Sequence, residues 1–156
     1  LGAKHLHIMS GCAEGPEAKE TFLRNLAWAA SEAPDQSLTI EPINTDTMPG
    51  YFLRSFDLGR EIVTAIDAPN LKLQFDTFHA AKITGDVLEI WEAMRDITVH
   101  IQVAQMPNRD EPTQGEIDYP AFFADLDVAG YDGWVSGEYK PRGNTQDGLS
   151  WIDQNS

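Results

Sequence analysis

Residues 37–44 read Ser-Leu-Thr-Ile-Glu-Pro-Ile-Asn, and this stretch decides which fold we expect. Leu38 and Ile40 predict a buried strand, and Glu41 places a carboxylate where that strand ends. Pro42 follows at once and ends the strand, because proline cannot donate to a strand ladder. In parallel α/β proteins, ligands bind at the carboxyl ends of the strands. Glu41 is therefore a candidate for one corner of a site, provided that other strands end in the same way.

Four further segments have the apolar pattern of strands, and helical patterns separate them. The expected strands are 4–10, 71–75, 97–104 and 134–139, and the expected helices are 16–33, one from 55 onward, 86–95, 119–127 and a last short one within 145–151. An alternation of strands and helices is typical of an α/β protein with a parallel sheet. We therefore predict this fold class in a single domain over residues 1–156.

Three of the other strands also end on an oxygen-bearing side chain. With Glu41, these residues are Asp76, Gln102 and Glu138, each roughly one strand–helix unit after the last. If the parallel sheet curves into a barrel, the four side chains converge on one face. Four oxygen ligands, three of them anionic, suit a hard divalent cation such as Mg²⁺ or Mn²⁺. The alternative for each carboxylate is an ordinary helix cap or loop residue.

The two histidines of the first expected strand admit two interpretations. His5 and His7 are two residues apart, so they share one face of a strand and could bind a metal together. No third ligand lies nearby in the sequence, which favours the simpler interpretation of two polar positions on a barrel strand.

Composition excludes several classes of function. The formal net charge is −14, from 11 basic and 25 acidic residues, so we expect no nucleic-acid partner and no anionic membrane surface. No run approaches the ~20 apolar residues of a membrane span. Cys12 is the single cysteine, which excludes an internal disulfide and fits a reducing compartment, so we expect a cytoplasmic protein.

Several segments together carry a family resemblance over nearly the whole chain. They are IEPIN at 40–44, LQFDTFH at 73–79, HIQVAQMPNRDEP at 100–112, GEIDYP at 115–120 and GYDGWVSGEYKPRG at 130–143. The chain resembles the hydroxypyruvate isomerase family, within the xylose isomerase-like TIM barrels. DTFHAAKITGD and EYKPRG resemble its 2-oxo-tetronate isomerase branch, whereas EPIN and MPGYF resemble hydroxypyruvate isomerase proper. The substrate stays open between these two.

The resemblance implies roles for the four strand-end residues. Glu41, Asp76, Gln102 and Glu138 match the family's metal-binding positions. Glu41 and Glu138 also match the pair that moves a proton between adjacent carbons through a cis-enediol, while the metal polarises the oxygens. The implied reaction is an isomerisation of a small 2-keto acid or sugar acid.

Three further residues match positions near the substrate or close to the site. His79 and Arg109 match substrate-contacting positions, and Arg109 suits a carboxylate because guanidinium binds it bidentately. Lys140 follows closely after Glu138 and could assist in binding. The alternative for Arg109 and Lys140 is an ordinary solvated charge.

The expected barrel is incomplete. A TIM barrel has eight strands, and the five expected here match the fourth to eighth of the family. We therefore expect this chain to be the later part of a longer protein. The first and last of five strands would leave open edges, so we also expect copies of the chain to associate and cover them.

Two other functions compete with the isomerase. One is a truncated barrel that folds or assembles without turnover. The other is a ketose 3-epimerase-like enzyme, which uses a similar metal site. Such epimerases typically have histidine where this chain has Gln102, which argues against this alternative.

Overall fold

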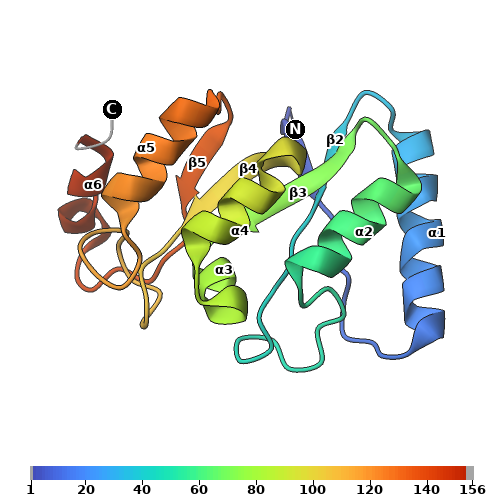
Figure 1. Cartoon of the computed structure of the whole chain (residues 1–156), viewed down its shortest axis with the longest axis horizontal. Coiled ribbons are helices and arrows are strands. Elements are labelled where there is room, and N and C mark those ends of the chain that lie inside the picture. The colour runs from blue at the N-terminus through green and yellow to red at the C-terminus, as the bar shows by residue number, and fades with distance from the viewer. Residues whose placement is uncertain (1, 154–156) are drawn as a thin grey trace.

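Five parallel strands form one sheet in the computed structural model, which describes residues 2–153 (Figure 1). The strands are β1 (His5–His7), β2 (Ser37–Ile40), β3 (Leu71–Asp76), β4 (Thr98–Val103) and β5 (Trp134–Gly137). They lie in the order β1-β2-β3-β4-β5, and each pair of neighbours is parallel. The predicted fold class, an incomplete parallel (β/α) barrel with five strands, is confirmed.

The sheet is strongly curved. Three strand spacings separate β1 from β4, which would be about 14 Å in a flat sheet. Nevertheless the ring centroids of His5 on β1 and His100 on β4 are only 5.8 Å apart. Both side chains therefore point to the concave face of a half-barrel.

Helices connect the strands and form a layer along the sheet (Figure 1). They are α1 (Pro16–Glu32), α2 (Phe56–Ile66), α3 (Thr77–Thr84), α4 (Val87–Met94), α5 (Tyr119–Ala129) and α6 (Ser150–Asp153), with 3-10 turns at Arg95–Ile97 and Thr145–Gly148. The side chains of Ser55 and Asp86 cap α2 and α4 by accepting backbone N–H groups. Among the described residues, the longest and most apolar helices fall short of what a membrane crossing requires.

Alternation along the strands separates the core from the site. Leu38, Leu73 and Phe75 are fully buried and belong to the apolar core beneath the helices. There Phe75 packs against Trp91 of α4 and Phe122 of α5, with ring centroids 5.7 and 6.2 Å away. Since side chains alternate across a strand, the polar residues between these positions face the concave side.

The structure differs from the sequence-based expectation most clearly at α3 and β1, and β5 ends at Gly137 instead of at residue 139. Helix α3 was not predicted, and it begins directly where β3 ends because the Asp76 carboxylate accepts the N–H groups of Phe78 and His79. Strand β1 was predicted over 4–10 but ends at His7. Beyond it, Ser10 bonds to the 51–53 segment instead of to β2, so the ladder stops early.

Candidate functional site

Polar side chains gather where the parallel strands end. Glu41 directly follows β2, Asp76 is the last residue of β3, Gln102 lies near the end of β4, and Glu138 directly follows β5. Asp76 and Gln102 are register partners on neighbouring strands. The four residues predicted to lie at strand ends are therefore found at or next to the carboxyl ends of β2, β3, β4 and β5. These ends lie at the same edge of the parallel sheet.

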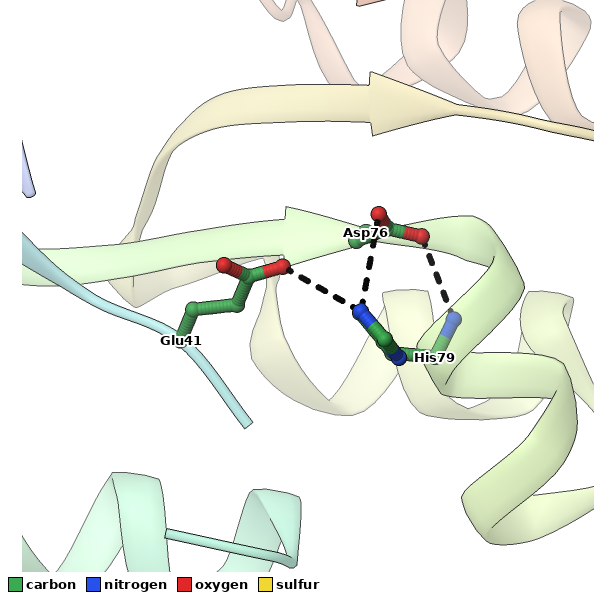
Figure 2. Close-up of side chains that lie close together, drawn as sticks. All are labelled: Glu41, Asp76 and His79. Atoms are coloured by element: carbon green, nitrogen blue, oxygen red, sulfur yellow. Dashed lines mark hydrogen bonds and ion pairs between the residues drawn. The ribbon is translucent and has the colours of Figure 1, made fainter. Parts of the chain in front are cut away.

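Glu41, Asp76 and His79 form the tightest cluster, with one ligand atom of each within 4.8 Å of the others (Figure 2). His79 Nε2 lies 3.9 Å from Glu41 Oε1 and 4.0 Å from Asp76 Oδ2. All three side chains are buried, with residue exposures of 4%, 1% and 2%. The histidine comes from α3, which Asp76 itself caps, so the helix position depends on a site residue.

The buried carboxyl groups of Glu41 and Asp76 both have pKa values above their ordinary range. Burial is the main cause that raises the pKa of Glu41 to about 8, and the charges of Asp76 and Glu138 add to it. The hydrogen bond from Gln74 and the charge of Arg109 act in the opposite direction. Burial likewise raises the pKa of Asp76 to about 6, against the charge of Arg109. Groups with such pKa values can exchange protons near neutral pH.

Arg109 joins two of the strand ends. Its Nη2 lies 2.8 Å from Asp76 Oδ2 and 3.0 Å from Glu138 Oε1. Its Nε donates to the backbone oxygen of Glu138, and its guanidinium lies 5.3 Å from the centroid of the Phe78 ring. Arg109 is therefore fixed in the site by ion pairs, and is not a loosely solvated loop charge.

Gln74 was not singled out from the sequence, yet it organises two of the predicted ligands. Its Nε2 donates to Glu41 Oε2 at 2.9 Å and to Gln102 Oε1 at 2.7 Å. It lies two residues before Asp76 on β3, so both side chains are on the same strand face. That spacing is the signal by which the sequence could have identified it.

The remaining predicted residues are less closely joined to the cluster. The side chain of Glu138 is 49% exposed and pairs with Arg109. Lys140 is exposed, and its ammonium forms no ion pair within residues 2–153, although its backbone N–H donates to the Arg109 carbonyl. These two residues therefore lie at the mouth of the site, while Glu41 and Asp76 lie inside it.

The donor set fits a divalent cation. Glu41 Oε1 is buried and lacks a hydrogen-bond partner among the described residues, which is costly for a carboxylate oxygen. A carboxylate oxygen of buried Asp76 lies within 4.8 Å of a carboxylate oxygen of Glu41. Gln102 is the register partner of Asp76 on β4, and Glu138 directly follows β5. Hard oxygen donors of this kind are those that Mg²⁺ and Mn²⁺ prefer.

His5 and His7 are on the concave face, where His7 Nε2 lies 3.6 Å from Glu41 Oε2. With His100 and Gln74 they line a cavity of about 420 Å³ beside the cluster. Within the described part of the chain, Glu41, Asp76 and His79 are the group of three that could hold a metal. The interpretation of His5 and His7 as polar positions of a barrel strand agrees with this placement.

Comparisons with known proteins agree with the architecture. The model of the xylose isomerase-like TIM barrel family matches residues 1–155. The 2-oxo-tetronate isomerase of Cupriavidus necator is 44% identical over 160 residues, which cover 97% of this chain and 61% of that protein. The putative hydroxypyruvate isomerase of Homo sapiens is 38% identical and is matched over 97% of this chain and 59% of its own length.

A solved structure is also similar over nearly the whole chain. The crystal structure of AP endonuclease, family 2 from Brucella melitensis superposes with a TM-score of 0.91 at 40% identity, covering 97% of this chain and 60% of that chain. This chain therefore spans about three fifths of the length of these three proteins.

Proposed function

This chain belongs to the xylose isomerase-like TIM barrel family, and from that premise we propose that it carries the acid–base and metal-binding part of an isomerase for a small keto acid or sugar acid. The observation that carries the proposal is the buried Glu41 beside Asp76, with a raised pKa and an oxygen, Oε1, that accepts no hydrogen bond from residues 2–153. The names of the relatives, 2-oxo-tetronate isomerase and putative hydroxypyruvate isomerase, agree with this chemistry.

In the proposed mechanism, Glu41 and Glu138 move one proton between adjacent carbon atoms. One glutamate removes the proton from the carbon that bears the hydroxyl group, which leaves a cis-enediolate. The other glutamate gives a proton to the neighbouring carbon, while the hydroxyl proton passes from one substrate oxygen to the other. The two residues differ in environment, since Glu41 is buried and Glu138 is half exposed. Carboxylates in different environments have different proton affinities, which suits opposite roles.

A divalent cation, Mg²⁺ or Mn²⁺, would be held by Glu41, Asp76, Gln102 and Glu138. When bound, it would polarise the carbonyl and hydroxyl oxygens of the substrate and so make the C–H group of the hydroxyl-bearing carbon more acidic. Gln74 orients two of these ligands through its single carboxamide. Arg109 already contacts Asp76 and Glu138, so its charge balances the carboxylates before a cation arrives.

Arg109 is also the group that we propose for the substrate carboxylate. Guanidinium binds carboxylates bidentately, and this residue lies between two strand ends at the site. His79 would contact a substrate oxygen from the opposite side, and Lys140 would add positive charge at the mouth. The substrate would be hydroxypyruvate or a 2-oxo-tetronate.

A product assay tests this function. The purified chain, supplied with Mg²⁺ or Mn²⁺, is incubated with hydroxypyruvate and separately with a 2-oxo-tetronate, and the isomeric products are measured. We expect turnover of one of the two, and its loss in Glu41→Gln and in Glu138→Gln. Glu20→Gln is the matched control, because Glu20 is an exposed residue of α1.

Three outcomes separate the alternatives when Mn²⁺ binding is measured alongside the assay and a free ketose is tested as a further substrate. Turnover that survives both site substitutions would remove the proposed roles of the glutamates. Absence of turnover while the wild-type chain still binds Mn²⁺ would favour a barrel part that folds and binds metal without catalysis. Epimerisation of a free ketose in place of keto-acid turnover would favour the epimerase-like alternative.

A further inference from the structure

Asn44 and His79 are joined by two hydrogen bonds at one atom. Asn44 lies three residues after Glu41, and His79 lies in the first turn of α3. The backbone N–H of Asn44 donates to His79 Nδ1 at 3.4 Å, and Asn44 Nδ2 lies 2.6 Å from the same nitrogen. Both residues are buried, with exposures of 4% and 2%. A backbone N–H can only donate, so His79 Nδ1 is the acceptor.

The orientation of the Asn44 carboxamide is fixed independently. The backbone N–H of Thr47 donates to Asn44 Oδ1 at 2.9 Å. That contact requires an oxygen at this position, so the NH₂ group is the side that faces His79. Two N–H donors consequently point at the lone pair of Nδ1.

A neutral imidazole carries one proton, and its position follows from these contacts. Because Nδ1 accepts from both donors it bears no proton, so the ring is not the doubly protonated imidazolium. Since Nδ1 accepts, the proton is on Nε2. The Nε2 atom is the one that faces Glu41 and Asp76, at 3.9 and 4.0 Å.

We propose that Asn44 is a positioning residue that holds His79 as the Nε2–H tautomer, so that the ring presents a hydrogen-bond donor to the site. Metal ligation by His79 would need the lone pair on Nε2 and therefore a proton on Nδ1, where it would meet the two donors of Asn44. His79 thus belongs outside the metal-ligand set, although it lies within ligand distance of the carboxylates. The identity of the acceptor rests on the proposed function: Nε2–H would donate to a carbonyl, hydroxyl or enediol oxygen of the substrate.

The tautomer can be measured directly by NMR in the metal-free chain. The chain has four histidines, so selective ¹⁵N labelling of their rings gives a spectrum that can be resolved, and His79→Gln identifies the signals of His79. We expect Nε2 to be protonated and Nδ1 to be unprotonated in the wild type. A wild-type ring with its proton on Nδ1 would overturn the proposal.

Substitution of Asn44 tests its role. Asn44→Asp keeps an oxygen for the Thr47 N–H and places a second oxygen opposite Nδ1, so we expect a proton on Nδ1 in this variant. Asn44→Ala removes the side-chain donor and should produce a measurable population of the Nδ1–H form, which keeps the test valid if the aspartate variant does not fold. Asn25→Asp, on the exposed face of α1, is the matched control and should leave the spectrum of His79 unchanged. An unchanged tautomer in both Asn44 variants would overturn the assignment of Asn44.

Metal binding provides a second readout that is independent of turnover. Binding of Mn²⁺ can be titrated by electron paramagnetic resonance. The dissociation constant of His79→Gln should stay within about tenfold of the wild-type value, whereas that of Asp76→Asn should rise by more than about tenfold. Loss of Mn²⁺ binding in His79→Gln would make His79 a ligand and overturn the proposal. A chain that has the expected tautomer but no isomerase activity would contradict the proposed function and leave the tautomer assignment intact.

Discussion

Gln74 Nε2 donates a 2.9 Å hydrogen bond to Glu41 Oε2, whereas the buried Oε1 of Glu41 has no hydrogen-bond partner among the described residues. One oxygen of the proposed proton carrier is thus held by the protein, and the other remains open to a ligand. The same Gln74 nitrogen donates to Gln102 Oε1, so a single side chain ties together two neighbouring strand ends.

Gln74→Leu should therefore damage both the site and the fold. The substitution leaves buried oxygens of Glu41 and Gln102 without their donor, which costs about 1–3 kcal/mol in the free energy of unfolding. Because the bond from Gln74 lowers the pKa of Glu41, its removal should raise that pKa further. Urea denaturation and the pH profile of turnover measure the two effects. Gln114→Leu, at an exposed loop position, is the control. Equal stability of the two variants would contradict the role of Gln74.

The stability of the chain should depend on pH through Glu41. Its folded pKa of about 8 lies above the ordinary glutamate value of 4.5, so its stabilising contribution is fully present below pH 4.5 and is lost as the pH rises from there through 8. Glu41→Gln does not titrate. We expect its free energy of unfolding, relative to the wild type, to increase by about 4 kcal/mol from pH 5 to pH 9.

Urea denaturation at the two pH values measures this difference. Glu20→Gln should show no such change, because Glu20 is exposed on α1. Saturating Mg²⁺ should reduce the difference, since a bound cation stabilises the ionised carboxylate of the wild type. A difference between Glu41→Gln and the wild type that is the same at both pH values would contradict the raised pKa.

Replacement of Arg109 should separate substrate binding from catalysis. Arg109→Ala is expected to raise KM for the keto acid by about tenfold or more, because a charge-assisted carboxylate contact is lost. Arg109→Lys should recover only part of the effect, because an ammonium group cannot make a bidentate contact. Steady-state kinetics on both variants, with exposed Arg24→Ala as control, provide the measurement. An unchanged KM in Arg109→Ala would remove Arg109 from substrate binding.

The open edges of the sheet should lead to self-association. β1 and β5 are the outer strands, and they expose Leu6 at 54% and Trp134 at 62%. Edge strands with exposed apolar side chains pair with other chains. Sedimentation velocity should show a species larger than the monomer, and Trp134→Lys should shift it toward the monomer. A wild-type chain that stays a stable, soluble monomer at every concentration would contradict this prediction.

Most of the fold was predictable because its signals are local. Apolar strands that end in turns, and helices with Ser55 or Asp86 before their first turn, are patterns that short-range physics produces. Helix α3 was missed because its eight residues follow β3 without a loop, and its N-cap is the last residue of that strand. Asp76 could be recognised as a site residue from sequence, but not as the cap that joins the strand to the helix.

The site was predictable to the level of strand ends and no further. The positions of Glu41 and Asp76 follow from where their strands stop. Side-chain partners do not follow, because the bonds from Gln74 and Asn44 depend on how far the sheet curves and on which strands become neighbours. The roles of all these residues stay predictions: Glu41, Asp76, Gln102 and Glu138 as metal ligands, Glu41 and Glu138 as proton carriers, and His79, Arg109 and Lys140 as substrate contacts.

Hydrogen–deuterium exchange into the substrate tests the central claim most directly, because it follows the proton that Glu41 and Glu138 are proposed to move. The chain is incubated in D₂O with Mg²⁺ and hydroxypyruvate or a 2-oxo-tetronate, and NMR follows the C–H signal next to the carbonyl against a protein-free sample. We predict deuterium incorporation that exceeds the spontaneous rate in the wild type and in Glu20→Gln, and that falls to the spontaneous rate in Glu41→Gln and Glu138→Gln. Exchange that persists undiminished in both of these variants would contradict the account.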